Sequence, residues 1–522
     1  MDKPNLSKQF RFHIGLVALS SLALGAVFQL ILSVGGFWQG FIAASLLIFL
    51  CGVAMYLLWR AAGAQQAIAW MMLAAFLLRL ILSVFLAWGL PRFGYEEPPQ
   101  QAGFVFFDAF RREGQAWMLA QSGDSLLRAF SDEFGTDQYG GMLTSSAAIY
   151  RTFSRDAFRP GLVAIVAAGA FSLSLPFLVT MLGKRFGIKI ALWAGWILAL
   201  YPEGVLLGAS QMREGFYILF ISMLLWSAGH WVAKEKLNLA YLVGSIATVG
   251  LLVFSYRVAI SAFGFILIWI WFEWTFTKKH QAWRIIRWGG LAVIAVVVLV
   301  GLQGWLVEAA RWDTLQTYRA SGRIQFHLEG LVNWLRSPLI WAYGIIQPFF
   351  PAAVTHPAPW IWRIIAIFRA FGWYLMLPLL VYAFLRVWKL PSSANKQFLG
   401  IAIIFIWMWI GISSIRAGGG QWDNPRYRAI FLPVMAALGG WGIVYARETK
   451  DRWFARMLLI EGIFLGFFTQ WYISRYYHMF ARLKLEVMIL VILILSAVVI
   501  LMGWLYDRKR PPWNLTEGDE ST

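Results

Sequence analysis

Apolar runs long enough to cross a lipid bilayer recur along this 522-residue chain from end to end. A helix needs about 20 apolar residues to cross the hydrocarbon core. Hydrophobic residues make up 60% of the chain and charged residues only 14%, and a soluble protein could not cover such an interior with polar surface. The strands of a transmembrane β-barrel would be shorter and would alternate in polarity. The sequence therefore predicts an all-α polytopic membrane protein.

The lengths of the runs predict about fourteen transmembrane helices. Two long connections, 91–159 and 308–365, interrupt the series. The expected spans are 12–34, 38–59, 66–90, 160–182, 188–208, 214–233, 238–257, 259–276, 287–307, 366–388, 397–415, 428–446, 454–477 and 485–506.

Lysine marks one side of this predicted topology. Twelve of the thirteen lysines fall in connections on the same side, and only Lys484 falls on the other. Because short connections rich in Lys and Arg stay in the cytoplasm, we expect this side and both termini to be cytoplasmic in a multi-pass inner-membrane protein. The opposite, extracytoplasmic side carries its positive charge mainly as arginine.

The net charge of +19 comes from these two sources. The sequence has no basic soluble domain of the kind that binds nucleic acid. A single cysteine, Cys51, excludes an internal disulfide and argues against a cysteine-based metal site. His327, His356 and His478 lie on the arginine-rich side, but no pair has the spacing of a metal-binding motif.

The segment from Phe93 to Pro160 is the first long polar stretch, with carboxylates interleaved among arginines. It predicts a water-facing loop with short helices that holds a catalytic carboxylate. Asp108 lies among phenylalanines at the start of an amphipathic segment expected at the membrane surface. Partial desolvation there would raise its basicity, which suits removal of a proton from an acceptor hydroxyl or amine. A structural pair with Arg111 or Arg112 is the other interpretation.

Further along the same stretch, Asp132, Glu133 and Asp137 form an acidic group. Adjacent carboxylates could hold a hard divalent cation through oxygen ligands, although solvated loop acids are the commoner interpretation. The glycine pair that follows them predicts a tight turn before a helix from Met142 to Phe153.

Charged residues also occur at the extracytoplasmic ends of later spans. Glu203 lies near the end of one span, and Arg213 and Glu214 begin the next. An acid at a helix start suits the helix dipole, yet charges at membrane depth are costly and often functional. Arg257 poses the same question at the following hairpin.

A second arginine group flanks a glycine run. Arg416 precedes Gly418 to Gly420, and Arg426 and Arg428 flank Tyr427 at the start of a span. Guanidinium binds phosphate or carboxylate through paired N–H groups, so the pair around Tyr427 predicts a phosphate clamp. Snorkelling anchors are the alternative. An arginine-rich face beside an acidic loop fits a site for an anionic lipid-linked substrate.

In their order and common side, these features resemble the GT-C superfamily of integral membrane glycosyltransferases. The resemblance is to bacterial members related to protein O-mannosyltransferases and to the aminoarabinose transferase of lipid A. The features that carry it are Asp108 with Arg112, Gln115 and Ala116; Tyr201-Pro202 to Arg213-Glu214; Arg257; Gln347 to Pro351; and Arg426-Tyr427-Arg428.

The resemblance implies a GT-C-like core at 66–446, preceded by two extra spans at 1–65 and followed by C-terminal spans at 447–510 and a cytoplasmic tail at 511–522. It implies transfer of a sugar from a polyprenyl-phosphate donor to a lipid, glycan or protein acceptor outside the cytoplasm.

In this family the acid of the first loop is the catalytic base or a metal ligand, which implies that role for Asp108, with Mg²⁺ or Mn²⁺ as the possible cation. Arginines of later loops contact the donor phosphate, which implies that role for Arg257, Arg426 and Arg428. Possible acceptor or metal contacts are Asp132, Glu133, Asp137, Glu203, Arg213 and Glu214.

Two other functions remain open from the sequence. An O-antigen ligase or polysaccharide polymerase would move a whole glycan from a pyrophosphate lipid, so monosaccharide and oligosaccharide donors would separate the two enzymes. A transporter or flippase of lipid-linked substrates would need charges inside the spans. Arg79, Glu273 and Glu461 are the few candidates, and flux without a covalent product would identify this function.

Overall fold

The computed structural model describes residues 6–131, 133–134, 140–276, 333–417 and 423–508, with isolated positions between 289 and 300. Within these ranges all regular secondary structure is helical. Ten described helices are long and apolar enough to cross a membrane, or twelve if each of two bent pairs is one span. A polytopic helical membrane protein is therefore confirmed, while the count of fourteen stays a prediction. The span predicted at 287–307 lies largely outside the described residues.

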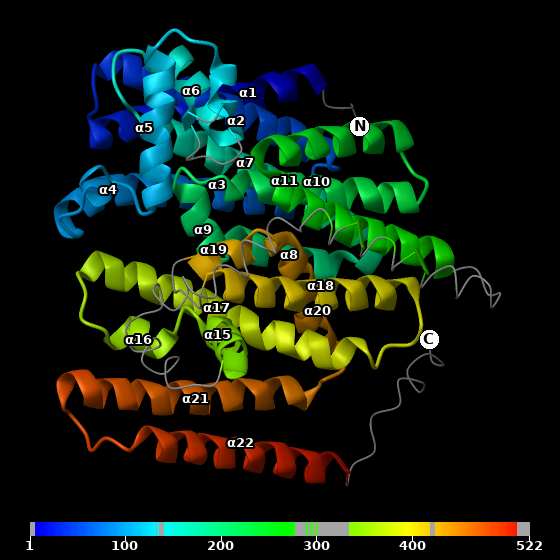
Figure 1. Ribbon diagram of the computed structural model, residues 1–522. Coiled ribbons are helices and arrows are strands. Elements are labelled where there is room, and N and C mark those ends of the chain that lie inside the picture. The colour runs from blue at the N-terminus through cyan, green and yellow to red at the C-terminus, as the bar shows by residue number, and fades with distance from the viewer. Residues whose placement is uncertain are drawn as a thin grey trace.

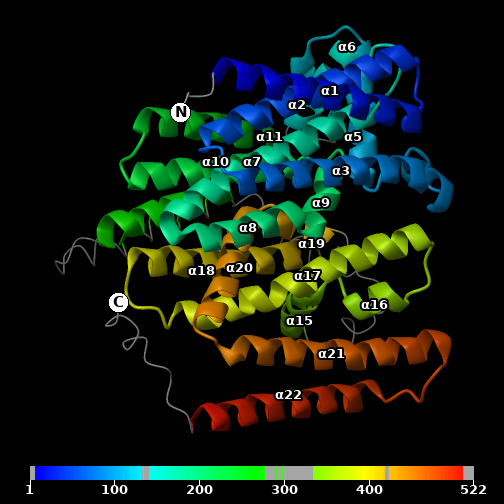
Figure 2. The ribbon, with the colours of Figure 1, turned by 180° about the vertical axis from the view of Figure 1, so that it is seen from behind.

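The long helices lie side by side in one bundle, as Figures 1 and 2 show from opposite sides. The start of α1 and the end of α22 lie at the same end of the bundle (Figure 1). The other end, near α4 and α5, is called the site end below. The long helices are α1 (Leu6–Leu32), α2 (Phe37–Ala61), α3 (Gln66–Phe93), α7 (Gly161–Phe186), α8 (Ile188–Leu200), α10 (Glu214–Val232), α11 (Leu237–Phe276), α17 (Trp360–Val387), α18 (Ala394–Arg416), α20 (Leu432–Glu448), α21 (Arg452–Tyr477) and α22 (Leu485–Arg508).

Three predicted span regions contain a break in the helix. The region predicted as one span at 188–208 is α8 followed by α9 (Pro202–Ala209), bent by 49°. The span predicted at 428–446 is mainly α20, and α19 (Asp423–Ala429), bent by 76° from α20, begins before the predicted start. Ser255 has extended backbone angles and divides α11 where two spans were predicted to meet. Irregular backbone inside a membrane protein is tolerated where protein or a cavity surrounds it.

A buried arginine supports the first of these breaks. The end of α8 leaves carbonyl groups without helical partners. Arg79 of α3 donates from Nη1 to the carbonyl oxygen of Ala199 at 3.0 Å, and its guanidinium lies 3.4 Å from the ring centroid of Phe171. Another of the charges considered for transport, Glu273, accepts from Arg185 at 2.8 Å and from Trp269 at 2.9 Å. These two charged residues have structural partners.

The polar stretch after α3 forms short helices, as predicted. They are α4 (Pro98–Gln101), α5 (Phe107–Gln121), the 3₁₀ helix η1 (Leu126–Phe130) and α6 (Gly141–Phe153). The predicted tight turn is present, because Gly140 has φ +72° immediately before α6. In Figure 1, α5 runs across the direction of the spanning helices. The remaining helices are α15 (Asn333–Ile346) and α16 (Phe350–Thr355).

Candidate functional site

A buried carboxylate fixes α5 against α6. The two oxygens of Glu113 accept hydrogen bonds from Ser146 Oγ at 2.9 Å and from the Tyr150 hydroxyl at 2.7 Å. Burial, followed by the charge of Glu113, raises the pKa of Tyr150 well above its usual value, so the phenol remains a donor. Arg112 of α5 also donates to the backbone carbonyl of Gln211, just before α10. These contacts set the position of α5, and Asp108 lies one turn before Arg112 on it.

Asp108 contacts a buried arginine from the far end of the sequence. Its Oδ2 accepts from Arg426 Nη1 at 3.0 Å, and the side chain of Asp108 remains 55% exposed. Arg426 Nε donates to Glu214 Oε1 at 2.6 Å, and both of these side chains are at most 4% exposed. The same Nη1 lies 3.6 Å from Asp423. One guanidinium thus joins an exposed carboxylate to a buried one, and Asp108 and Arg426 lie together.

The arginines change the expected acidity of Asp108. Burial acts to raise its pKa, but the hydrogen-bonded charge of Arg426 and the charges of Arg213 and Arg112 outweigh burial and lower it. The expectation that desolvation makes this carboxylate more basic is therefore wrong for this structure, because neighbouring positive charge favours the ionised form. Asp108 is ionised at neutral pH.

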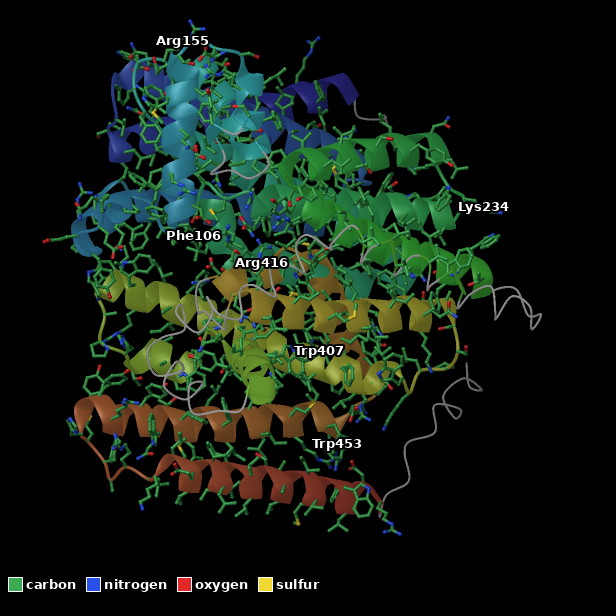
Figure 3. All side chains as sticks on the ribbon, viewed as in Figure 1. Phe106, Arg155, Lys234, Trp407, Arg416 and Trp453 are labelled. Atoms are coloured by element: carbon green, nitrogen blue, oxygen red, sulfur yellow. The ribbon has the colours of Figure 1, made fainter. Side chains whose placement is uncertain are left out.

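A pocket lies on the other side of Arg426, between α10, α11, α18 and α19. It contains about 580 Å³ of empty space, including space open to solvent. Four arginines line it: Arg213, Arg257, Arg416 and Arg426, together with Glu214. Figure 3 shows Phe106 and Arg416 toward the site end and Lys234 at the opposite end. Among the described residues of the lining, four positive charges against one negative charge give a net charge of +3.

The pocket continues between α11 and α18. Arg257 and Arg416 lie at its site end. Trp409 also lines it, seven residues before Arg416 and therefore about 10 Å further along α18. Further from the site end, the two helices are in contact through the ring pairs Phe265–Phe405 and Trp269–Phe398, each with centroids 4.8 Å apart. The space between α11 and α18 is thus a wedge. It is charged at the site end, and the aromatic contacts close it at the other end.

No family model and no curated protein matches this chain. The candidate function therefore rests on the contacts of the described residues.

Arg428 occupies a different environment from Arg426. Its guanidinium donates to the carbonyl oxygens of Gly344 and Gln347 and lies 3.6 Å from the ring centroid of Trp373. Among the described residues it is not part of the pocket lining. The predicted clamp from the two arginines around Tyr427 is not formed, because residues two apart on a helix point roughly 200° away from each other.

Arg416 has a place in the site that was not predicted from the sequence. It ends α18, and its guanidinium lies 4.6 Å from the ring centroid of Tyr427. The sequence grouped it with the later arginines but gave it no contact with the donor. Its position at a helix end before a glycine run was the available signal.

Glu203 belongs to a buried ion pair outside the pocket lining. Its carboxylate accepts from Arg369 Nε at 2.6 Å and from Nη2 at 2.8 Å, and both side chains are at most 2% exposed. This geometry favours a structural role over contact with the acceptor. It leads to a stability prediction, since removing one member of a buried ion pair leaves the other charge poorly compensated.

We expect Glu203→Gln to lower the unfolding free energy by about 3–5 kcal/mol, the usual cost of breaking a buried ion pair. Thermal unfolding in detergent measures it. Glu448→Gln is the matched control, because Glu448 pairs with Lys189 where both side chains are exposed and exposed pairs contribute little. Equal melting temperatures for the two variants would contradict a structural role for Glu203.

The acidic group after η1 is only partly described. Asp132 and Asp137 lie outside the described residues, and Glu133, which is exposed, accepts from Arg128. In the described ranges no group of three or more His, Cys, Asp or Glu side chains could hold a metal ion. The side chains that shift the pKa of Asp108 are arginines, which are not metal ligands. The cation implied by the resemblance stays a prediction.

Proposed function

We propose that this protein is a membrane glycosyltransferase of GT-C type. It moves a sugar from a polyprenyl-phosphate donor to a lipid, glycan or protein acceptor on the extracytoplasmic face. The observation that carries the proposal is the contact between Asp108 and Arg426 beside a pocket lined by four arginines. An anion site and a water-accessible carboxylate are the two parts that such a transfer requires.

The pocket is the donor side of the site. The net charge of +3 on its described lining residues attracts an anion, and guanidinium groups bind phosphate oxygens with matched geometry. Arg213, Arg257, Arg416 and Arg426 are the residues we assign to the donor phosphate. They replace the trio expected from sequence, because Arg428 is held elsewhere by backbone carbonyls.

The wedge between α11 and α18 is the place we assign to the first units of the lipid chain. Val258, Ile412 and Trp409 line it beside the arginines, together with the small hydroxyl residues Ser261 and Ser413. A mainly apolar space next to a charged one matches a lipid phosphate, whose chain continues directly from its charged headgroup. Burial of each methylene group contributes about 0.8 kcal/mol to binding.

We assign Asp108 to the part of the site that receives the acceptor. Its carboxylate is 55% exposed, so an acceptor hydroxyl or amine can approach it from water. In the proposed step the acceptor atom bonds to the anomeric carbon while the bond from that carbon to the phosphate oxygen breaks. The electron pair leaves with the lipid phosphate, and the acceptor proton passes to Asp108. Attack opposite the leaving group inverts the anomeric centre.

The arginines stabilise charge where it grows. A lipid phosphodiester carries one negative charge, and the departing phosphate gains another as the sugar leaves. In many enzymes, preorganised donors aimed at such developing charge supply most of the rate enhancement. A carboxylate with a lowered pKa fits this step, because the attacking atom becomes strongly acidic only once its bond to the sugar has formed. In this step the guanidinium charge stabilises the departing phosphate.

Reconstituted protein, a panel of undecaprenyl-phosphate monosaccharides and a membrane extract as the source of acceptor test the proposal. We expect one sugar of the panel to be transferred, with release of undecaprenyl phosphate measured by mass spectrometry. Turnover of an oligosaccharide-pyrophosphate lipid, with no turnover of any phosphate monosaccharide, would instead identify the ligase or polymerase.

A bulky side chain in the wedge separates lipid binding from phosphate binding. We expect Ser413→Trp, on the pocket wall, to weaken binding of undecaprenyl phosphate at least about tenfold, since displacing two methylene groups already costs that much. Binding of methyl phosphate, which has no prenyl chain, should change much less. Both are measured by titration in detergent micelles.

Met408→Trp is the control for this experiment, because Met408 lies on the same helix with its side chain exposed. Equal loss of both ligands in Ser413→Trp, or the same loss of undecaprenyl phosphate in Met408→Trp, would contradict the assignment of the wedge to the chain.

A further inference from the structure

We propose that Arg426 couples the two substrates: binding of the donor phosphate draws Arg426 away from Asp108 and frees that carboxylate for the acceptor. The inference rests on the proposed function and adds an order to it. In the resting site the carboxylate is engaged, and the donor makes it available.

Arg426 is shared between unequal partners. Glu214 is buried and holds Nε at 2.6 Å. Its second oxygen, Oε2, is buried without a hydrogen-bond partner among the described residues. Breaking the contact between Glu214 and Arg426 would therefore leave a buried carboxylate with little compensation, which is strongly unfavourable. Glu214 fixes the guanidinium in the pocket wall.

Asp108 is the partner that can be exchanged. It is bonded through one oxygen to Nη1 at 3.0 Å, and its side chain is 55% exposed. Water can solvate this carboxylate once Arg426 turns its Nη groups to another anion. Arg112 and Arg213 also act on Asp108, so the released carboxylate remains near positive charge at the start of α5.

A donor phosphate and Asp108 are therefore competitors for one guanidinium. Arg426 lines the pocket, and its Nη1 points to Asp108. Coupling between two ligands is reciprocal: if bound phosphate weakens the contact with Asp108, then Asp108 weakens phosphate binding by the same factor. Removing the charge of Asp108 should strengthen donor binding, although it removes the catalytic base.

The direction of the change in donor affinity distinguishes this coupling from a role of Asp108 in holding the donor or the fold. If Asp108 helped to hold the donor, or only supported the local fold, its replacement would weaken donor binding or leave it unchanged. A general loss of negative charge would strengthen binding without regard to the hydrogen bond. Asp423 separates these cases, since its carboxylate lies 3.6 Å from the same Nη1 but is not hydrogen-bonded to it.

The experiment titrates undecaprenyl phosphate into the purified full-length chain in detergent. We expect Asp108→Asn to bind it at least about fivefold more tightly than the wild type does. A fivefold change is at the lower end of typical coupling between two ligands. Asp108→Ala should show the same sign. Asp423→Asn removes an equal charge and should give a clearly smaller gain. Melting temperatures confirm that each variant is folded.

Unchanged or weaker binding in the folded Asp108 variants would overturn the coupling, and so would an equal gain in Asp423→Asn. If folded wild-type protein binds no undecaprenyl phosphate, the proposed donor site itself fails, and the coupling fails with it. Binding by the wild type without the gain in the Asp108 variants leaves the donor site standing and removes only the coupling.

Discussion

Asp108→Asn should reduce sugar transfer by about 10²–10⁴-fold, the usual contribution of a general base, while the protein stays folded. Asn keeps the size of the side chain but cannot accept the acceptor proton. Asp108 is half-exposed at the start of α5, and α5 is held by other contacts, so the fold does not depend on it. Turnover of undecaprenyl-phosphate sugar by reconstituted protein is the measurement.

Asp124→Asn is the matched control for that experiment. Asp124 lies in the same polar stretch, is exposed and pairs with Arg128. It has no place in the proposed step and should retain activity. Full activity in Asp108→Asn would remove the base assigned here, even if the arginine pocket still bound lipid phosphate.

Arg426→Gln should have the second large effect, on both activity and stability. Loss of one charged donor to the departing phosphate costs about 10²–10³-fold in rate. The substitution also leaves Glu214 buried without the guanidinium that holds it, so the melting temperature should fall. Transfer rate and thermal unfolding are measured on the same preparation.

A double variant separates the two losses. Arg426→Gln with Glu214→Gln removes both buried charges, so we expect stability to return while transfer stays low. Arg428→Gln is the comparison two residues away, where the side chain binds carbonyl groups and Trp373. It should lower stability without a selective loss of donor binding. Recovery of transfer in the double variant would show that Arg426 only neutralises Glu214.

The sequence predicted the apolar spans well because hydropathy depends only on local composition. It treated 188–208 as a single span, whereas this region is a bent pair, and it began the span at 428, after most of the bent helix α19. Hydropathy is nearly the same for a straight and a bent apolar segment. Pro202, at the start of α9, was the visible sign of one bend, since proline lacks the N–H that would continue the helix.

The candidate site was predictable in outline and not in detail. Residue order and sidedness placed Asp108 near the late arginines, and Arg426 does contact it. The sequence could not show which of Arg426 and Arg428 faces the pocket, because the rotation of a short helix is set by its packing. It also missed that Glu214 neutralises Arg426, since that pairing joins residues 212 positions apart.

That separation has a consequence for synthesis. A ribosome adding about 5–20 residues per second makes Arg426 roughly 10–40 s after Glu214. During this interval the carboxylate at the start of α10 lacks the cation that later neutralises it. A chain that stops before α19 therefore keeps this acid in its bundle without its Arg426 partner, and its N-terminal half cannot complete the donor pocket alone.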